Sequence, residues 1–205
     1  MVNRKSIYIP KEVYNSNLYH PREDTYLIED YILENKDLFI DKEILEMFCG
    51  YGYISILLKK IGAKRVVSVD INEEVLKIGK KLADINNVDI TFIKSDVFDN
   101  VVGTYDIIIA NPPYLKGYPR NIEELSYYAG PNLEIVYKFL SQLPDFMKDD
   151  GFALLVLSSL SDLENITKFL NRMKLDYQIV KKKHIFFEDL YLLKIEKKKE
   201  DSSSR

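Results

Sequence analysis

The sequence predicts an α/β fold in which helices cover both faces of one mainly parallel sheet. Short runs of β-branched and other apolar residues alternate along the chain with longer amphipathic runs, which is the pattern of successive β-α-β units. The alternation continues over residues 44–196 without an internal repeat or a break in composition. A chain of 205 residues can bury one substantial core, so we expect one domain.

The alternation predicts a mostly parallel seven-stranded sheet with an antiparallel last strand. The strands are predicted at residues 44–48, 65–69, 90–93, 105–110, 152–158, 177–180 and 190–196. The helices are predicted at residues 25–35, 53–61, 73–86, 133–147 and 162–174.

The elements of the N-terminal half follow from apolar periodicity. Residues 25–35 carry one apolar stripe at helical spacing, and we expect the acidic residues of this helix to face water. The continuous apolar runs 44–48 and 65–69 are typical of strands buried on both faces, and 53–61 is the helix between them. Asn72 is a favourable N-cap for the next helix, because its side chain can accept a backbone hydrogen bond.

The C-terminal elements follow from capping signals and from short β-branched runs. Ser161 and Glu164 match a capping box at the start of the last helix. The runs 177–180 and 190–196 are expected to pair as antiparallel strands. The polar tail 197–205 is predicted to be disordered.

Composition excludes several classes of protein. The net charge of -3 leaves no global positive field to attract nucleic acid or anionic membranes, although a local basic groove stays possible. No apolar run approaches the roughly 20 residues of a membrane span, and residues 1–9 lack the apolar core of a secretion signal, so we expect a cytoplasmic protein. Cys49 is the only cysteine, and only His20 and His184 could join it as ligands, so no structural metal is expected.

Two glycines follow the first predicted strand. Gly50 and Gly52 stand where the chain enters helix 53–61, and a ligand can approach the backbone closely at such a helix start. The full G-x-G-x-x-G spacing and a phosphate cradle are absent, which argues against a dinucleotide. A glycine turn that serves only chain geometry is the alternative.

Acidic residues follow the next two strands. Asp70 can accept hydrogen bonds from the two vicinal hydroxyls of a ribose. Asp96 can reach an adenine amino group, while Val97 offers its backbone N–H to the ring. Each acid alone could be solvated surface, but strand ends of an open α/β sheet converge on one crevice. Together these residues predict an adenosine ligand.

The segment Asn111-Pro112-Pro113-Tyr114 comes directly after strand 105–110. The prolines stiffen this turn, so the Asn111 side chain and the Pro112 carbonyl can act as two fixed acceptors for a planar NH₂ group. When both N–H bonds are held, the nitrogen lone pair can turn toward a sulfonium methyl. Tyr114 would cover the flat group and favour a transient cation. The alternative is a rigid loop whose sequence is a coincidence.

At these residues the sequence resembles class I methyltransferases, and more closely the HemK-like protein glutamine N5-methyltransferases of the archaeal and eukaryotic release-factor type. Residues 18–27 are similar to the Y-x-P-x-E-D-T-x-L signature of that subfamily, and residues 127–136 and 187–191 are similar to two later segments. The resemblance implies a Rossmann-like fold, S-adenosyl-L-methionine as cofactor with S-adenosyl-L-homocysteine as product, and a glutamine substrate such as that of the GGQ motif in a release factor. It divides the chain into an N-terminal extension and signature loop (1–24), a methyltransferase domain (25–196) and a tail (197–205).

The resemblance also implies roles for individual residues. Thr25, Glu46 and the loop after the first strand hold the methionine end of the cofactor, Asp70 takes the ribose, and Asp96 with Val97 takes the adenine. The residues implied for the cofactor are Thr25, Glu46, Phe48, Gly50, Gly52, Asp70, Asp96, Val97 and Asn111. The residues implied for the substrate are Asn111, Pro112, Pro113 and Tyr114, with catalysis assigned to Asn111, Pro112 and Tyr114.

Two departures from the subfamily pattern bear on function. Phe48 stands where the loop usually has its first glycine, so we expect altered packing with retained backbone contact. The helical recognition domain of bacterial relatives is missing ahead of the signature, so substrate docking is expected to use the catalytic domain or a partner. The resemblance implies a small zinc-binding activator subunit that pairs beside strand Ile90 to Ile93, which would otherwise be an apolar edge. A short, tolerated edge is the alternative.

Two rival functions remain at this point. An adenine-N6 methyltransferase of DNA or RNA would use the same Asn-Pro-Pro-Tyr turn, but the acidic chain has no basic domain for a flipped base. A noncatalytic cofactor-binding scaffold would be expected to have lost Asn111 and Tyr114, and the chain retains both. The lysine runs 181–183 and 197–199 could contact RNA, with solvated charge as the alternative.

Overall fold

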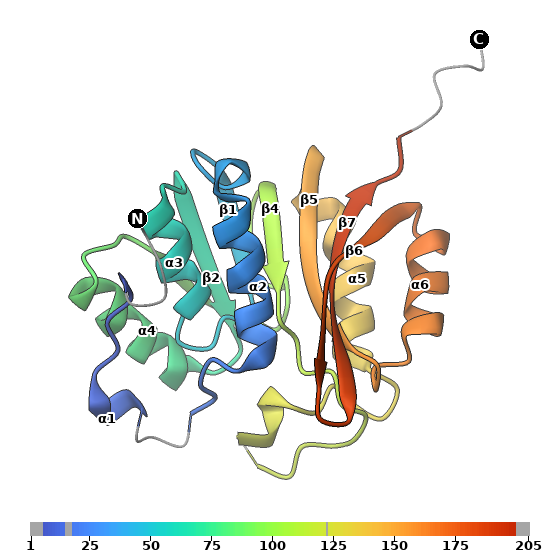
Figure 1. The fold of residues 1–205 in the computed structure, drawn as a ribbon, viewed down its shortest axis with the longest axis horizontal. Coiled ribbons are helices and arrows are strands. Elements are labelled where there is room, and N and C mark those ends of the chain that lie inside the picture. The colour runs from blue at the N-terminus through green and yellow to red at the C-terminus, as the bar shows by residue number, and fades with distance from the viewer. Residues whose placement is uncertain (1–5, 15–17, 122, 200–205) are drawn as a thin grey trace.

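A single seven-stranded sheet runs through the molecule, with helices on both of its faces (Figure 1). The computed structural model describes residues 6–14, 18–121 and 123–199. The strands are β1 (Glu43–Met47), β2 (Arg65–Asp70), β3 (Thr91–Lys94), β4 (Tyr105–Ala110), β5 (Met147–Ser158), β6 (Leu175–Ile185) and β7 (Glu188–Lys197). The helices are α1 (Lys11–Tyr14), α2 (Glu23–Glu34), α3 (Tyr53–Ile61), α4 (Glu73–Ile85), α5 (Glu134–Phe146) and α6 (Leu163–Arg172), with 3-10 turns at η2 (Lys36–Leu38) and η3 (Glu123–Ser126).

The strand order is β3-β2-β1-β4-β5-β7-β6. The first five strands pair in parallel, whereas β7 pairs antiparallel with both β5 and β6. The predicted sheet is therefore confirmed, including its antiparallel last strand. The order reverses between β1 and β4, and open α/β sheets bind ligands beyond the carboxyl ends of the strands at such a switch point.

Alternating side chains of the strands build one apolar core on each face of the sheet. In β1, Ile44 belongs to the core that α2 and α3 cover, whereas Leu45 and Met47 belong to the core under α5 and α6. Because both faces are covered, the central strands are apolar along almost their whole length. This explains why they appear in the sequence as continuous apolar runs.

All five predicted helices are present, with ends within two residues of the predicted ones. Asn72 caps α4 as expected, since its side chain accepts a hydrogen bond from the Glu74 backbone N–H at 3.0 Å. The structure adds the short helix α1 and extends β6 to Ile185. The extension passes through the polar run 181–183, which an edge strand such as β6 tolerates because one side of it faces solvent.

Two expectations about helices are wrong. Asp162, not Ser161, is the N-cap residue of α6. Asp162 has a φ of 51°, and its side chain makes no capping hydrogen bond. The Ser161 hydroxyl instead accepts from the Ser158 backbone N–H at 3.0 Å and donates to the Tyr114 carbonyl at 3.3 Å. In α2, Glu29 is fully buried rather than facing water, because the Tyr53 hydroxyl donates to its carboxylate at 3.2 Å.

β3 is an edge strand, as predicted, and pairs with β2 alone in the described part of the chain. Its apolar side chains are half-buried rather than exposed. The Phe92 ring packs so closely on α4 that a Cβ at Gly79 would come 2.6 Å from it. A larger residue at position 79 would therefore displace this ring.

The two ends of the chain are only partly described. Ile7 and Ile9 pack into the core beside α2 and α3, and β7 ends at Lys197, which pairs with Asp149 at 2.8 Å. Residues 1–5 and 200–205, and with them most of the predicted tail, lie outside the described residues. In the part of the chain that the structure describes, none of the helices combines the length and apolar composition of a membrane span.

Candidate functional site

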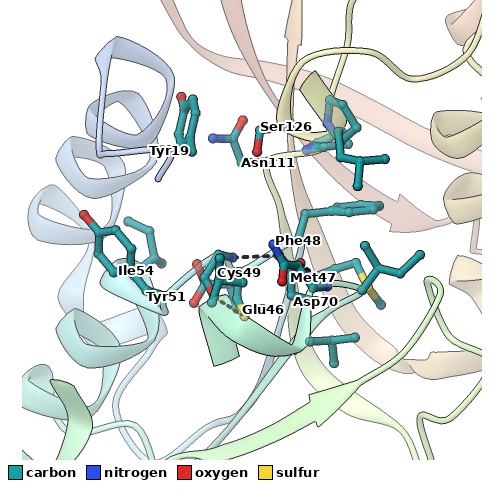
Figure 2. A pocket seen from close by; sticks show the side chains of 18 of the residues that line it. Tyr19, Glu46, Met47, Phe48, Cys49, Tyr51, Ile54, Asp70, Asn111 and Ser126 are labelled. Atoms are coloured by element: carbon teal, nitrogen blue, oxygen red, sulfur yellow. Dashed lines mark hydrogen bonds between the residues drawn. The ribbon is translucent and has the colours of Figure 1, made fainter. Parts of the chain in front are cut away.

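A pocket lies beyond the carboxyl ends of the central strands, at the switch point of the sheet (Figure 2). Five parts of the chain line it: the signature loop with the start of α2, the turn after β1 with the start of α3, the ends of β2 and β3 with the segments that follow, the turn after β4, and η3 with the start of α5. The lining includes the predicted residues Thr25, Glu46, Phe48, Gly50, Asp70, Asp96, Val97, Asn111, Pro112 and Pro113. The structure therefore brings ten of the predicted residues together around one pocket, and their contacts with ligands stay a prediction.

Two predicted residues lie elsewhere. Gly52 is not among the pocket-lining residues; it begins α3 behind the pocket, where a Cβ would come 3.0 Å from the Phe92 ring. Tyr114 lines a second cavity next to the pocket. The two cavities share Tyr19, Asp24 and Ser126, so they adjoin each other at these three residues.

The turn after β1 has left-handed backbone at three positions. The φ angles are 60° at Phe48, 53° at Gly50 and 78° at Gly52. A phenylalanine therefore adopts a conformation that glycine adopts without strain. The Phe48 ring packs against Phe139 of α5 at a centroid distance of 6.0 Å. Phe48, which replaces the usual first glycine of this loop, therefore has the left-handed backbone that favours glycine, and its ring adds a contact to the core.

Asp70 fastens this turn to the end of β2. Its Oδ2 accepts from the Gly50 backbone N–H at 2.9 Å, and its Oδ1 accepts from the Asn72 backbone N–H at the same distance. Burial raises the pKa of the Asp70 carboxyl, and the backbone N–H groups of Asn72, Gly50 and Ile71 oppose that rise. A carboxylate has further lone pairs, so the predicted contact with a ribose stays compatible with this geometry.

Glu46 is a buried carboxylate at the base of the pocket. Its Oε2 accepts from the Ser55 backbone N–H at 2.8 Å and from the Ser55 hydroxyl, which also contacts the Ser68 hydroxyl. Burial raises the pKa of Glu46 to about 8. Among the described residues, the groups that shift its pKa are Ser55 and Asp70, and neither is a cation. A ligand ammonium would supply the missing positive charge.

Asp96 and Val97 line the pocket just after the end of β3. The Asp96 side chain is 55% exposed and pairs with Lys138 of α5 at 3.0 Å. Val97 is buried with a φ of 52°, which is an unusual conformation for a β-branched residue and is common at functional sites. The adenine contacts of both residues remain a prediction.

Asn111 carries the most informative feature of the pocket. Its Oδ1 is buried and has no hydrogen-bond partner within the described residues. Figure 2 shows its side chain between those of Tyr19 and Ser126. A buried acceptor without a donor costs free energy of about 1–3 kcal/mol, so such an atom calls for a functional explanation. A ligand that donates an N–H to this oxygen would satisfy it.

Tyr19 and Asp24 belong to the signature but were not predicted as site residues. The Tyr19 hydroxyl lies 2.5 Å from both Asp24 carboxylate oxygens, and the Thr25 backbone N–H donates to Asp24 at 2.6 Å. Burial, and then the Asp24 charge, raise the pKa of the Tyr19 hydroxyl. The Arg22 guanidinium lies 5.6 Å from the Tyr19 ring centroid. The signature motif of residues 18–27 was the sequence signal that could have pointed to Tyr19 and Asp24. Their contacts with each other depend on the fold.

The crevice fits an S-adenosyl ligand. Glu46, whose charge no cation of the described residues balances, stands where the resemblance puts the methionine end, and two strand-end acids, Asp70 and Asp96, line the same pocket. The protein has a seven-stranded sheet with an antiparallel last strand, and the crevice lies at the switch point of that sheet. These two features define an α/β methyltransferase of class I. The methyltransferase small domain family matches residues 25–187, and the chain belongs to that family. It is an S-adenosylmethionine-dependent methyltransferase.

Comparisons with individual proteins agree with this family. A Methanocaldococcus jannaschii protein, provisionally named protein N5-glutamine methyltransferase, is 34% identical over 183 residues, which are 86% of this chain and 90% of that protein. The ribosomal protein L11 methyltransferase of Thermosipho africanus is also 34% identical, but over 55% of this chain and 36% of its own length.

A chain in the solved structure of the E. cuniculi Mtq2–Trm112 complex, described as responsible for methylation of the eRF1 translation termination factor, shares the fold. Its TM-score is 0.71, with 23% identity over 89% of this chain and 99% of that chain.

Proposed function

We propose that the protein transfers a methyl group to the side-chain amide nitrogen of a glutamine in a translation release factor. The observation that carries the proposal is the buried Asn111 Oδ1 without a donor among the described residues. A primary amide has two N–H donors, and the Asn111 side chain with the Pro112 carbonyl offers two acceptors. The amide nitrogen is a poor nucleophile because its lone pair is delocalised, so fixing both N–H bonds is what such a reaction requires.

The turn after β4 is rigid enough to hold an amide in place. Pro112 and Pro113 are buried, and their rings fix φ. The Tyr114 carbonyl accepts from the Ser161 hydroxyl, so the segment between β5 and α6 supports the turn. Burial raises the pKa of the Tyr114 hydroxyl, which keeps its ring neutral beside the reacting group. The bound cofactor supplies an electrophilic methyl on its sulfonium.

Two of the similar proteins support glutamine in a termination factor. The M. jannaschii relative bears the name of a glutamine methyltransferase, and the Mtq2–Trm112 complex is described as methylating eRF1. Methyltransferases of ribosomal protein L11 also match the chain, so the substrate itself belongs to the proposal. An adenine base is less favoured because each lysine of the run 181–183 pairs with an acid of this chain. A release factor as substrate places the enzyme in the cytoplasm.

A small activator subunit is part of the same proposal. β3 ends the sheet, and its outer backbone edge is available for one more strand in the described part of the chain. The partner in the Mtq2–Trm112 complex supports a second subunit for this fold. The zinc site of that subunit is implied by the sequence resemblance alone.

Identification of the methylated atom tests the proposal. The chain, alone and with a candidate subunit, is incubated with labelled S-adenosylmethionine and either a release factor of archaeal or eukaryotic type or single-stranded nucleic acid. Mass spectrometry should find the label on one glutamine side chain of the release factor. Label on adenine, with none on the protein, would establish the rival enzyme instead.

A further inference from the structure

The turn between β6 and β7 exposes two phenylalanines. Phe186 is 93% exposed and Phe187 is 97% exposed, and they form a two-residue loop between the paired residues Ile185 and Glu188. Two-residue hairpin loops favour residues such as Asn and Gly, because such turns need positive φ. Phe186 has a φ of 32°. Neither solvation nor turn geometry explains this pair, so a role in binding is the remaining explanation.

The turn is held firmly to the rest of the protein. The Ser158 hydroxyl donates to the Glu188 carboxylate, and the Ser159 backbone N–H donates to the Asp189 carbonyl at 2.8 Å. His184 Nδ1 lies 3.0 Å from the Asp189 carboxylate. The first two contacts tie the turn to the end of β5, and the third joins the two strands of the hairpin beside the turn.

The turn borders the entrance to the site. Phe186 lines the second cavity together with Arg22 and Tyr114, and that cavity adjoins the pocket of Asn111. Figure 1 shows the β6–β7 turn at the same end of the molecule as the segment between β4 and α5. Two other exposed apolar residues belong to loops at this end, Tyr118 at 75% and Leu160 at 53%. We call Tyr118, Leu160, Phe186 and Phe187 the apolar rim.

The charges around the rim identify the kind of partner. Lys181 pairs with Glu34 at 2.7 Å, Lys182 pairs with Asp189 at 2.9 Å, and Lys183 pairs with Glu23. The lysines of β6 are therefore neutralised by the protein itself. Nucleic acid and anionic membranes are recognised through free basic groups, which this hairpin does not offer. An uncharged protrusion with two aromatic rings fits a hydrophobic depression on a protein.

We propose that the Phe186–Phe187 turn is a docking contact for the protein substrate, whose glutamine reaches Asn111 through the second cavity. The inference rests on the proposed protein substrate and adds a contact outside the pocket. The tip engages the folded body of the substrate, while the cavity between Arg22 and Tyr114 admits its extended segment. The rings contribute to affinity for the substrate and not to the transfer step.

The double variant Phe186→Ser/Phe187→Ser tests this contact. Val102→Ser is the matched control, because Val102 is 72% exposed but lies just before the amino end of β4, whereas the pocket lies beyond its carboxyl end. Steady-state kinetics with a release factor should give a KM raised at least tenfold in the double variant, with kcat within twofold of the wild type. The control should keep both constants, and cofactor binding by calorimetry should be equal in all three proteins.

Several results would overturn the docking contact. One is an unchanged KM in the double variant, and another is a loss confined to kcat. The double variant could also keep its affinity for the substrate and lose another interaction instead. Loss of binding to vesicles of phosphatidylcholine with phosphatidylglycerol would assign the tip to a membrane. Loss of self-association would assign it to a second copy of the chain, and loss of activator binding would assign it to the activator subunit. Failure of the proposed function is distinguishable, because wild-type enzyme would then methylate no glutamine of the release factor at all.

Discussion

The Asp70 carboxylate accepts a hydrogen bond of 2.9 Å from the backbone N–H of Gly50, twenty residues earlier in the chain. This bond joins the end of β2 to the turn after β1 across the floor of the pocket. The same carboxylate also accepts from the start of the turn that leads into α4. Its position is therefore set before any ligand arrives, which reduces the free energy that binding would spend on ordering.

Substitution of Asp70 should weaken cofactor binding. Asp70→Ala removes the acceptors expected for the ribose hydroxyls and loosens the Gly50 turn, and the expected loss is about 1–3 kcal/mol of binding free energy. Titration calorimetry measures it. Asp99→Ala is the control, since Asp99 is a half-exposed acid that pairs with Lys138 outside the pocket lining. Equal affinity in the Asp70 variant would mean that the carboxylate does not contact the cofactor.

Cofactor binding should release a proton from Glu46. Its pKa of about 8 leaves the carboxyl mostly protonated in the free enzyme at pH 7, and the cofactor ammonium favours the ionised form. Affinity should therefore rise with pH between about 6 and 8, until the α-amino group of the cofactor, with a pKa of about 8, loses its own proton. Calorimetry at pH 7 in buffers of different ionisation enthalpy should show release of more than about half a proton.

The Glu46→Gln variant is the control for that titration. Glutamine keeps the shape and has no titrating proton, so its complex should form without proton release and with flat affinity over this pH range. Equal proton release in the variant and the wild type would show that another group titrates. Glu46 would then not be the partner of the ammonium.

Phe48 should reverse the usual stability order of alanine and glycine variants. At a φ of 60°, alanine carries a steric cost of about 1–2 kcal/mol that glycine avoids, which exceeds the roughly 0.4–1 kcal/mol that glycine loses in chain entropy. Phe48→Gly should therefore be more stable than Phe48→Ala by about 0.5–1 kcal/mol in denaturant unfolding. At the exposed helical residue Lys80, the alanine variant should be the more stable one. The same order at both positions would contradict the left-handed turn.

The sequence was sufficient to predict the sheet, and ten of the residues that it predicted for a site line one pocket. Both depend on local patterns, because continuous apolar runs mark buried strands and the functional residues follow directly after them. Asp70 and Asn111 could be predicted because each comes at the end of a strongly apolar strand. The turn residues Phe48 and Gly50 could be predicted from their place between β1 and α3.

What the sequence could not supply depends on partners that are distant in the chain. Glu29 is buried where its carboxylate accepts a hydrogen bond from the Tyr53 hydroxyl. Asp96 is exposed and forms an ion pair with Lys138. Ser161 matched a local capping pattern, but the Tyr114 carbonyl is its partner across the site. Local patterns cannot reveal such contacts, because chain topology decides which side chains meet.

The proposed reaction depends on Asn111 holding the substrate amide during methyl transfer. The turnover of Asn111→Ala with a release factor tests this role, measured by radiolabel transfer beside the cofactor affinity of the same variant. The kcat is expected to fall by about 10²–10³-fold, because the lost acceptor acts chiefly in the transition state, while cofactor affinity stays within about threefold of the wild type. A kcat within about threefold of the wild type would rule out this role of Asn111.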